Sequence, residues 1–407
     1  MPRIAPLAMS AATLPAALAA RDWKNVEPVR TPRERNEAID WLRGAVMVLM
    51  ALDHTRSFVG SAVELDTATA ALFFTRWVTH FCAPVFVLLA GTGAFLHGRR
   101  LASRAALARY LATRGLWLVA LEVTVVRFVW TGHIGPQHLF LQVIWVIGAS
   151  MIALAALVSL PRWVIALVAL ILIGGHDAFD AIYADQLGSA RWLWLLLHQP
   201  GMLHPFAGAD WFLLYPLIPW VAVMAAGYAL GPSALLPRAQ RRTRFARLGA
   251  ALIVGFVILR ATNLYGDPQP WSADHGWLRA GLGFLNCEKY PPSLLYLAMT
   301  LGPAFVVLAW VDRPLGRWAE RVALFGRVPL FYYVMHLALI HALAIVLAWR
   351  ALGREGVTQQ FLMTGGLGYS LPAVYALWVA VVLALYPACR WFAGVKRRSD
   401  AAWLSYL

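Results

Sequence analysis

The sequence is poor in charge, in acidic residues and in cysteine. Only 14% of its 407 residues are charged, and 20 Asp and Glu stand against 35 Lys and Arg. A soluble domain of this length needs far more polar surface to cover its core, which excludes a soluble globular protein. The three cysteines, Cys82, Cys287 and Cys389, show neither CxxC nor metal-ligand spacing. No disulfide framework or zinc site is therefore indicated, and we expect no metal.

Hydrophobic residues dominate instead. They make up 60% of the chain, and the mean hydropathy is +0.63. Many runs reach the roughly 20 apolar residues that a helix needs to cross a hydrocarbon core of about 30 Å. The sequence predicts an all-α, polytopic membrane helix bundle with about ten transmembrane helices. The expected spans are 38–60, 77–97, 105–128, 138–160, 162–180, 212–231, 244–263, 292–311, 328–349 and 370–392.

The basic residues are concentrated in alternate loops. Loops 61–75 and 129–137 contain no Lys or Arg. This alternation is the positive-inside pattern and predicts that both termini are cytoplasmic. The net charge of +15 is not gathered on one face, which argues against nucleic-acid binding. The clusters are Arg99, Arg100, Arg104, Arg109 and Arg114 after the second span, Arg238, Arg241, Arg242, Arg244 and Arg247 after the sixth, Arg313, Arg317, Arg321 and Arg327 after the eighth, and Lys396, Arg397 and Arg398 near the end.

The first 36 residues differ from the rest. They are Ala-rich and then of mixed charge, and residues 7–20 resemble a short signal peptide. Cleavage there would leave the Arg-rich stretch outside, against the charge bias, so a disordered or surface-lying tail is favoured. We expect one membrane domain over residues 37–407.

The first span carries ionisable side chains, which are costly at membrane depth and therefore often functional. Asp40 and Arg43 are three residues apart and are expected to pair. Arg43 and His54 are eleven apart, so they lie on nearly the same helical face, separated by roughly 16 Å along the axis. The alternative is a helix-end ion pair and a core histidine with a purely structural role.

Several segments resemble a known family. They are AIDWLRGAVMVLMALDHTRSF (38–58), HFCAPVFVLLAGTGAFL (80–96), LQVIWVIGASMI (141–152), YPLIPWVAVMAAGYALG (215–231), FLNCEKYPPSLLYLAMTLGP (284–303), GRVPLFYYVMHLALIH (326–341) and YPACRWFAGVKRRS (386–399). The first is similar to the opening helix of the transmembrane acyltransferase superfamily, with its Arg, ten residues and His. Together they resemble bacterial relatives of heparan-alpha-glucosaminide N-acetyltransferase. In the lysosomal enzyme, the active histidine lies in a segment that this chain does not clearly reproduce.

The resemblance implies transfer of an acetyl or other acyl group. The donor would be cytoplasmic acetyl-CoA or another acyl-CoA. The acceptor would be a sugar amine or hydroxyl on the outer side of the bacterial inner membrane. In this reading His54 is the catalytic base or a transient acyl carrier. Adjacent helix positions diverge by about 100°, so Glu122 is a better orienter of His54 than Asp53. The cations of Arg43, Arg99 and Arg100 would hold the phosphates of CoA.

Other polar residues in or beside the expected spans are candidate substrate-binding groups. For each, the alternative is a structural role in packing or in an ion pair. The positions of His138, Gln142 and Trp145 predict one shared helical face. The candidates are Asp40, Asp53, Arg56, His80, Arg127, Gln142, Lys289 and Tyr290.

Two other classes of function remain open. A multi-span transporter or permease would use the same buried charges along a solute path, although no paired broken helices in two halves support it. A non-catalytic envelope assembly protein is the third reading. The lipid bilayer is the expected environment, the acceptor is undetermined, and an oligomer is possible.

Overall fold

The computed structural model describes residues 36–61, 69–273, 276–362, 366–399 and 401. The described chain is overwhelmingly helical, which confirms the expected all-α membrane bundle. Residues 1–35 of the expected N-terminal tail lie outside the described residues, so the tail and its boundary stay predictions.

Each of the ten expected spans coincides with helix over most of its length. Their bounds are α2 Glu37–Val59, α3 Ala70–Thr79 with α4 Cys82–Gly98, α5 Arg104–Leu121 with α6 Arg127–Thr131, α7 Val143–Leu157, α8 Arg162–Gly175, α10 Leu217–Leu230, α11 Arg238–Thr262, α13 Leu294–Val311, α15 Pro329–Leu362 and α16 Leu371–Arg398. A π-helical turn, Glu122–Val126, joins α5 to α6.

Seven helical segments in the described residues are long and apolar enough to cross a bilayer. The expected number of ten spans is therefore not confirmed. Of the remaining expected spans, α7 is apolar but shorter, and α2 carries both Asp40–Arg43 and Asp53–Arg56 within its length. The seven are Ala70–Gly98, Arg162–Phe179, Leu217–Leu235, Arg238–Thr262, Leu294–Val311, Pro329–Thr358 and Leu371–Arg398.

Short polar side chains define where several helices begin. Asn36 precedes α2 and accepts a hydrogen bond from the Ile39 N–H at 3.3 Å. Ser293 precedes α13 and accepts one from the Tyr296 N–H at 3.0 Å. Such caps satisfy backbone donors that lack a partner in the first turn.

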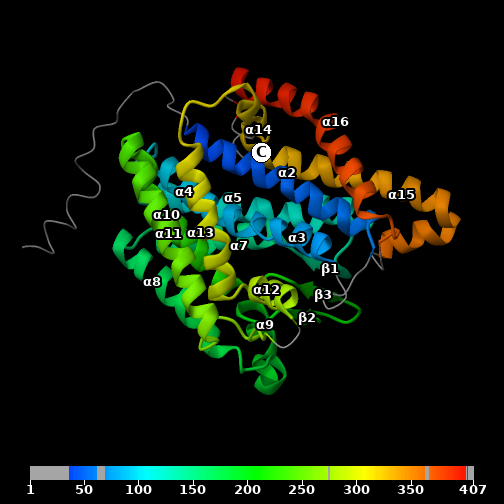
Figure 1. Cartoon of the computed structure of the whole chain (residues 1–407), viewed down its shortest axis with the longest axis horizontal. Coiled ribbons are helices and arrows are strands. Elements are labelled where there is room, and N and C mark those ends of the chain that lie inside the picture. The colour runs from blue at the N-terminus through cyan, green and yellow to red at the C-terminus, as the bar shows by residue number, and fades with distance from the viewer. Residues whose placement is uncertain (1–35, 62–68, 274–275, 363–365, 400, 402–407) are drawn as a thin grey trace, which may run out of the picture. The chain divides into compact units, whose positions relative to one another are not determined.

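The expected span 138–160 does not begin as a helix. His138–Leu141 form strand β1, which pairs in parallel with β3 (Asp210–Leu213), and β3 pairs antiparallel with β2 (Gly201–Leu203). Helix α7 starts only after Gln142, so the predicted helical face of His138, Gln142 and Trp145 is wrong. Figure 1 shows these strands at the same end of the bundle as α9 (Arg191–Leu197) and α12 (Trp277–Leu285).

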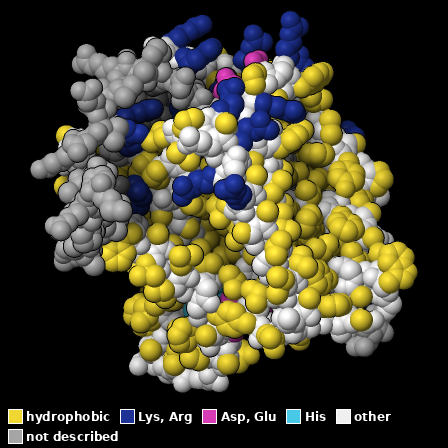
Figure 2. All heavy atoms as spheres, turned by 60° about the vertical axis from the view of Figure 1, so that its left-hand side comes forward, with side chains coloured by type: hydrophobic (Ala, Val, Ile, Leu, Met, Phe, Trp, Pro, Cys, Tyr) yellow, Lys and Arg dark blue, Asp and Glu magenta, His cyan; other side chains and the backbone are white. Residues whose placement is uncertain are grey.

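The opposite end of the bundle is basic. In the face drawn in Figure 2, Lys and Arg side chains gather toward the upper end, and a mostly hydrophobic surface lies below them. Arg99, Arg100, Arg244, Arg313 and Arg317 are exposed. This separation of charge from apolar surface agrees with the positive-inside pattern of the sequence.

Helix α2 lies in close backbone contact with α14 (Arg317–Arg327). A Cβ added at Gly44 would collide with the carbonyl of Val322, and one added at Gly326 would collide with the carbonyl of Asp40. Glycine at both positions lets the two helices approach more closely than side chains would permit. This contact fixes the position of the N-terminal half of α2 against α14.

We expect Gly326→Val to destabilise the protein by about 1–3 kcal/mol or more, because the added methyl groups must displace the backbone of α2. Thermal unfolding and size-exclusion profiles in detergent measure the effect. Gly93→Ala is the matched control, since a Cβ there meets no atom within 4 Å. Equal melting temperatures for the two variants would contradict the close contact.

Candidate active site

The C-terminal half of α2 places His54 in a buried aromatic pocket. Its side chain is among the buried polar groups, and the residue is 9% exposed. The His54 ring packs edge-on against Trp130, with centroids 5.0 Å apart, and against Tyr333 at 6.1 Å. Trp130 comes from α6 and Tyr333 from α15, so three helices that are distant in sequence enclose the imidazole.

A second histidine, His336, is hydrogen-bonded to His54. Nδ1 of His54 lies 2.8 Å from Nε2 of His336, and Nδ1 of His336 lies 2.7 Å from the carbonyl oxygen of Tyr332. A carbonyl oxygen only accepts, so the proton of a neutral His336 is on Nδ1 and its Nε2 is an acceptor. His54 must then donate from Nδ1. The unprotonated Nε2 of His54 is left to accept a proton.

The expected orienter of His54, Glu122, is engaged elsewhere. Its carboxylate oxygens accept hydrogen bonds from the backbone N–H groups of Gln142 at 3.0 Å and Trp145 at 3.2 Å. Glu122 therefore caps the start of α7, where a carboxylate is favoured by the helix dipole. His336 occupies the role that the sequence analysis gave to Glu122, and the predicted pairing is corrected.

Asp40 and Arg43, in the N-terminal half of α2, form the expected ion pair. Nη1 of Arg43 lies 3.5 Å from Oδ1 of Asp40 and donates to the carbonyl oxygen of Gly326 at 3.2 Å. Arg327 approaches the same carboxylate at 3.9 Å. Arg43 thus contacts α14 and His54 contacts α15, which follows α14 directly, so both face the same neighbouring segment of the chain.

A charged cluster forms around Asp53, the residue that precedes His54. Asp53 and Arg56 pair at 3.0 Å on α2. Lys289 reaches the same region from the loop before α13. Burial alone would lower the pKa of Lys289, yet that pKa is raised because Tyr290 and Asp53 favour the charged ammonium. The structure therefore brings together three of the candidate substrate-binding residues, Asp53, Arg56 and Lys289.

Tyr290 and His80 border this cluster. The hydroxyl groups of Tyr290 and Tyr215 lie 3.3 Å apart, and the Tyr296 hydroxyl donates to the His80 carbonyl oxygen at 2.8 Å. Both ring nitrogens of His80 are buried without a hydrogen-bond partner in the described structure. An imidazole in this state is available to a bound polar molecule or to water.

The remaining candidates are farther apart in the fold. Arg127 is 8% exposed on α6, and its Nε and Nη1 have no hydrogen-bond partner among the described residues. Gln142 acts through its backbone in the cap of α7. Arg99 and Arg100 follow the end of α4 and are exposed at the basic end of the bundle.

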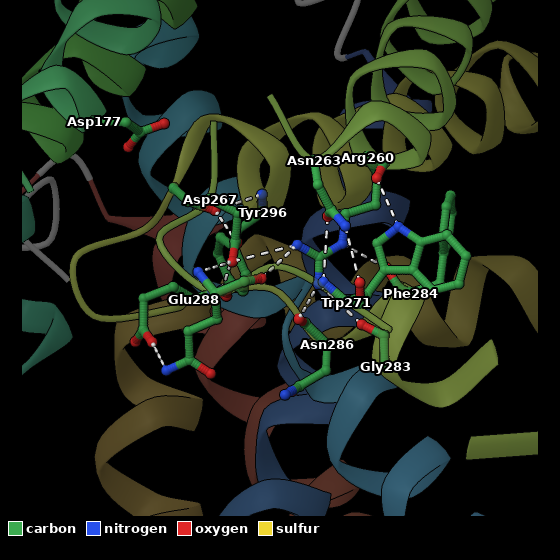
Figure 3. A network of polar contacts seen from close by, with 12 residues as sticks. Asp177, Arg260, Asn263, Asp267, Trp271, Gly283, Phe284, Asn286, Glu288 and Tyr296 are labelled. Atoms are coloured by element: carbon green, nitrogen blue, oxygen red, sulfur yellow. Dashed lines mark hydrogen bonds and ion pairs between the residues drawn. The ribbon is translucent and has the colours of Figure 1, made fainter. Parts of the chain in front are cut away.

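Arg260 anchors the loop that carries Lys289 and Tyr290. This side chain is 2% exposed, and it donates to the carbonyl oxygens of Phe284, Gln269, Gly283 and Asn286 at 2.8–3.1 Å. Figure 3 shows the guanidinium at the centre of these carbonyl groups. A backbone without regular structure needs such donors where water is scarce.

Asp267 completes the anchor. It pairs with Arg260 at 3.4 Å and accepts from the Glu288 N–H and the Ser293 hydroxyl, both at 2.8 Å (Figure 3). The segment 288–293, which carries Lys289, is thereby held in place. Sequence reasoning missed this pair, although an arginine inside the apolar run 244–263 was a signal that a buried partner was needed.

These features define a polytopic membrane protein with a buried histidine pair at the C-terminal half of its first long helix. A family model described as heparan-alpha-glucosaminide N-acetyltransferase, catalytic, matches residues 35–262, more than half of the chain. The chain belongs to this family, which confirms the resemblance seen in the sequence. A search of curated proteins finds no match. The matched residues include His54 and His80, whereas Lys289 and His336 lie beyond them.

We expect Arg260→Met to release the loop, because it strands the buried Asp267 carboxylate and four carbonyl groups. Breaking one partner of a buried pair typically destabilises a protein by about 3–5 kcal/mol. Limited proteolysis of residues 264–293 and the melting temperature report the change. The control is Arg279→Met, since Arg279 is exposed on α12. Loop cleavage no faster than in that control would contradict the anchoring role.

Proposed function

We propose that this protein transfers an acetyl group from cytoplasmic acetyl-CoA to an amine or hydroxyl of a sugar on the outer side of a bacterial inner membrane. Its family supports acetyl transfer, and the His54–His336 pair is the observation that carries the proposal. A neutral imidazole with one free nitrogen suits proton removal near neutral pH. The family resemblance and the basic end of the bundle support the proposed sugar acceptor and its side of the membrane.

In the proposed reaction, Nε2 of His54 accepts the proton of the attacking amine or hydroxyl. The freed lone pair forms a bond to the thioester carbonyl carbon, and the C–S bond then breaks. The proton on His54 passes to the leaving CoA sulfur, so charge and atoms balance. Through its bond to His336, Nδ1 of His54 keeps its proton throughout. Formation of an acyl-imidazole on Nε2 is the alternative route through the same atom.

The charged cluster beside His54 is the proposed acceptor site. Lys289 and Asp53 offer a donor and an acceptor to sugar hydroxyl groups, and the unpartnered ring of His80 offers a third polar group. Tyr290 closes this region through its contact with Tyr215. Few polar groups placed in an otherwise apolar pocket are typical of sites that select a small ligand.

The inner end is the proposed donor site. Arg99 and Arg100 are exposed beyond α4, where their guanidinium groups are accessible to CoA phosphates. Arg43 has a different environment, since Asp40 and Gly326 already contact it. We assign Arg43 to holding α2 against α14, with donor binding as a secondary role.

We expect His54→Ala to reduce kcat by about 10²–10⁴-fold, the usual contribution of a general base. His336→Leu should reduce kcat by about 10–100-fold, comparable to other residues that orient a functional histidine. The KM for acetyl-CoA should not change in either variant. Acetyl transfer by reconstituted protein, followed with labelled acetyl-CoA and glucosamine-type acceptors, measures both.

His336→Gln serves as the matched variant, because its amide oxygen can accept the proton of His54 Nδ1. We expect it to recover part of the activity that His336→Leu loses. His133→Ala is the control, since His133 is exposed in the loop after α6. Full activity of His54→Ala would overturn the proposed base.

We expect the double variant Arg99→Ala, Arg100→Ala to bind acetyl-CoA at least about 10-fold more weakly, since hydrogen bonds to charged groups contribute about 1.5–3 kcal/mol each. The difference should shrink at high salt, as for other exposed charges. Isothermal titration in detergent measures the affinity, and Arg317→Ala on α14 is the control. Equal affinity of the double variant and the control would place the donor elsewhere.

A further inference from the structure

A second cluster of histidine and carboxylate lies at the outer end of α8. His176 opens a short 3-10 turn, His176–Phe179, that continues α8, and Asp180 follows this turn. His198 comes from the end of α9. Nε2 of His198 lies 3.1 Å from Oδ1 of Asp180, and one ligand atom from each of the three residues lies within 4.8 Å of the others.

The imidazoles of this cluster are buried, and some of their ring nitrogens have no hydrogen-bond partner among the described residues. His176 is 2% exposed and His198 is 3% exposed. Neither ring nitrogen of His176 has a hydrogen-bond partner among the described residues, and Nδ1 of His198 has none. Nδ1 of His176 still lies 3.2 Å from the Asp177 carboxylate, and the backbone of Pro292 is a hydrogen-bonding neighbour of the same ring. Nδ1 of His198 and one nitrogen of His176 are therefore the atoms available to another species.

Asp177 provides a carboxylate beside one ring nitrogen of His176, as is usual for metal-binding histidines. Its Oδ1 lies 3.2 Å from Nδ1 of His176, and its Oδ2 accepts from the Leu294 N–H at 2.9 Å. A carboxylate beside one ring nitrogen directs the other nitrogen toward a metal and raises its basicity. Asp177 also ties the cluster to the start of α13, and Figure 3 shows it apart from the Arg260–Asp267 network.

We propose that His176, Asp180 and His198 bind a divalent transition-metal ion, with Zn²⁺ as the preferred ion. Two imidazoles and one carboxylate form a common ligand set for Zn²⁺, with a water at the fourth position. This site departs from the expectation of no metal, which rested on cysteine spacing and on other histidines. The ion joins α8 to α9 and, through Asp177, supports the segment that leads into α13.

An ordinary hydrogen-bonded cluster would not have this composition. A buried water could bridge two of the nitrogen atoms, but the Asp180 carboxylate, 3.1 Å from Nε2 of His198, places a negatively charged oxygen ligand beside them. A cation neutralises this charge, whereas water does not. The site is separate from the proposed acetyl transfer, because it contains none of the residues assigned to that reaction.

The test is metal content and metal-dependent stability of the full-length protein, purified in detergent from zinc-supplemented cells. We expect about one Zn²⁺ per chain by mass spectrometry after dialysis, because three protein side chains hold the ion. Chelation should lower the melting temperature, and added Zn²⁺ should restore it. Co²⁺ in place of Zn²⁺ should give visible absorption bands of a four-coordinate site with nitrogen and oxygen ligands.

Matched variants distinguish this site from adventitious binding. His176→Ala and His198→Asn should lose the bound ion and the Co²⁺ bands, and Asp177→Asn should bind Zn²⁺ about 10–100-fold more weakly. His204→Ala should behave as wild type, because His204 is exposed and pairs with Asp210 outside the cluster. X-ray absorption of the wild type, which needs no variant to fold, should show two imidazole ligands.

Two results would overturn the proposal. One is a wild-type protein that contains no metal and shows no melting shift with Zn²⁺ or Co²⁺. The other is a double variant of His176 and His198 that retains the ion. Neither result bears on acetyl transfer, which is measured separately.

Discussion

The account depends on one hydrogen bond between two buried imidazoles. His54 and His336 are 282 positions apart in the chain, yet Nδ1 of the first and Nε2 of the second lie 2.8 Å apart. The Tyr332 carbonyl fixes the proton on His336, and His336 in turn fixes the proton on His54. The chain of three groups thereby selects one tautomer, and it leaves a single nitrogen of His54 for chemistry.

The requirement that buried polar groups be satisfied explains the surrounding structure as well. Arg260 and Asp267 form hydrogen bonds with the backbone of the irregular loop before α13, and they place Lys289 near Asp53. Glu122 satisfies the first N–H groups of α7. In an apolar medium an unpaired polar group is costly, so each irregular segment is matched by a specific side chain. Where partners are lacking, as at His80, a ligand is the natural candidate.

Hydropathy and charge spacing predicted most of the helices, because a membrane helix is determined by a local run of apolar residues. The Asp40–Arg43 pair was also predictable, since both residues lie on one helix. His336 was not identified, because its partner is distant in sequence and no local pattern reveals it. Arg260 stood out as a charge within the apolar run 244–263, but its partners lie on a later loop that the sequence does not place. The strand at His138–Leu141 was missed for a related reason: its pairing partner, β3, lies about seventy residues later.

The most direct test of the account is the protonation state of His54, measured by nitrogen NMR on histidine-labelled protein in lipid. We predict a proton on Nδ1 of both His54 and His336, no proton on Nε2 of His54, and a coupling across the bond between the two rings. The signals are assigned by their loss in His54→Gln and His336→Gln. A proton on Nε2 of His54 in the resting protein would contradict the proposed base.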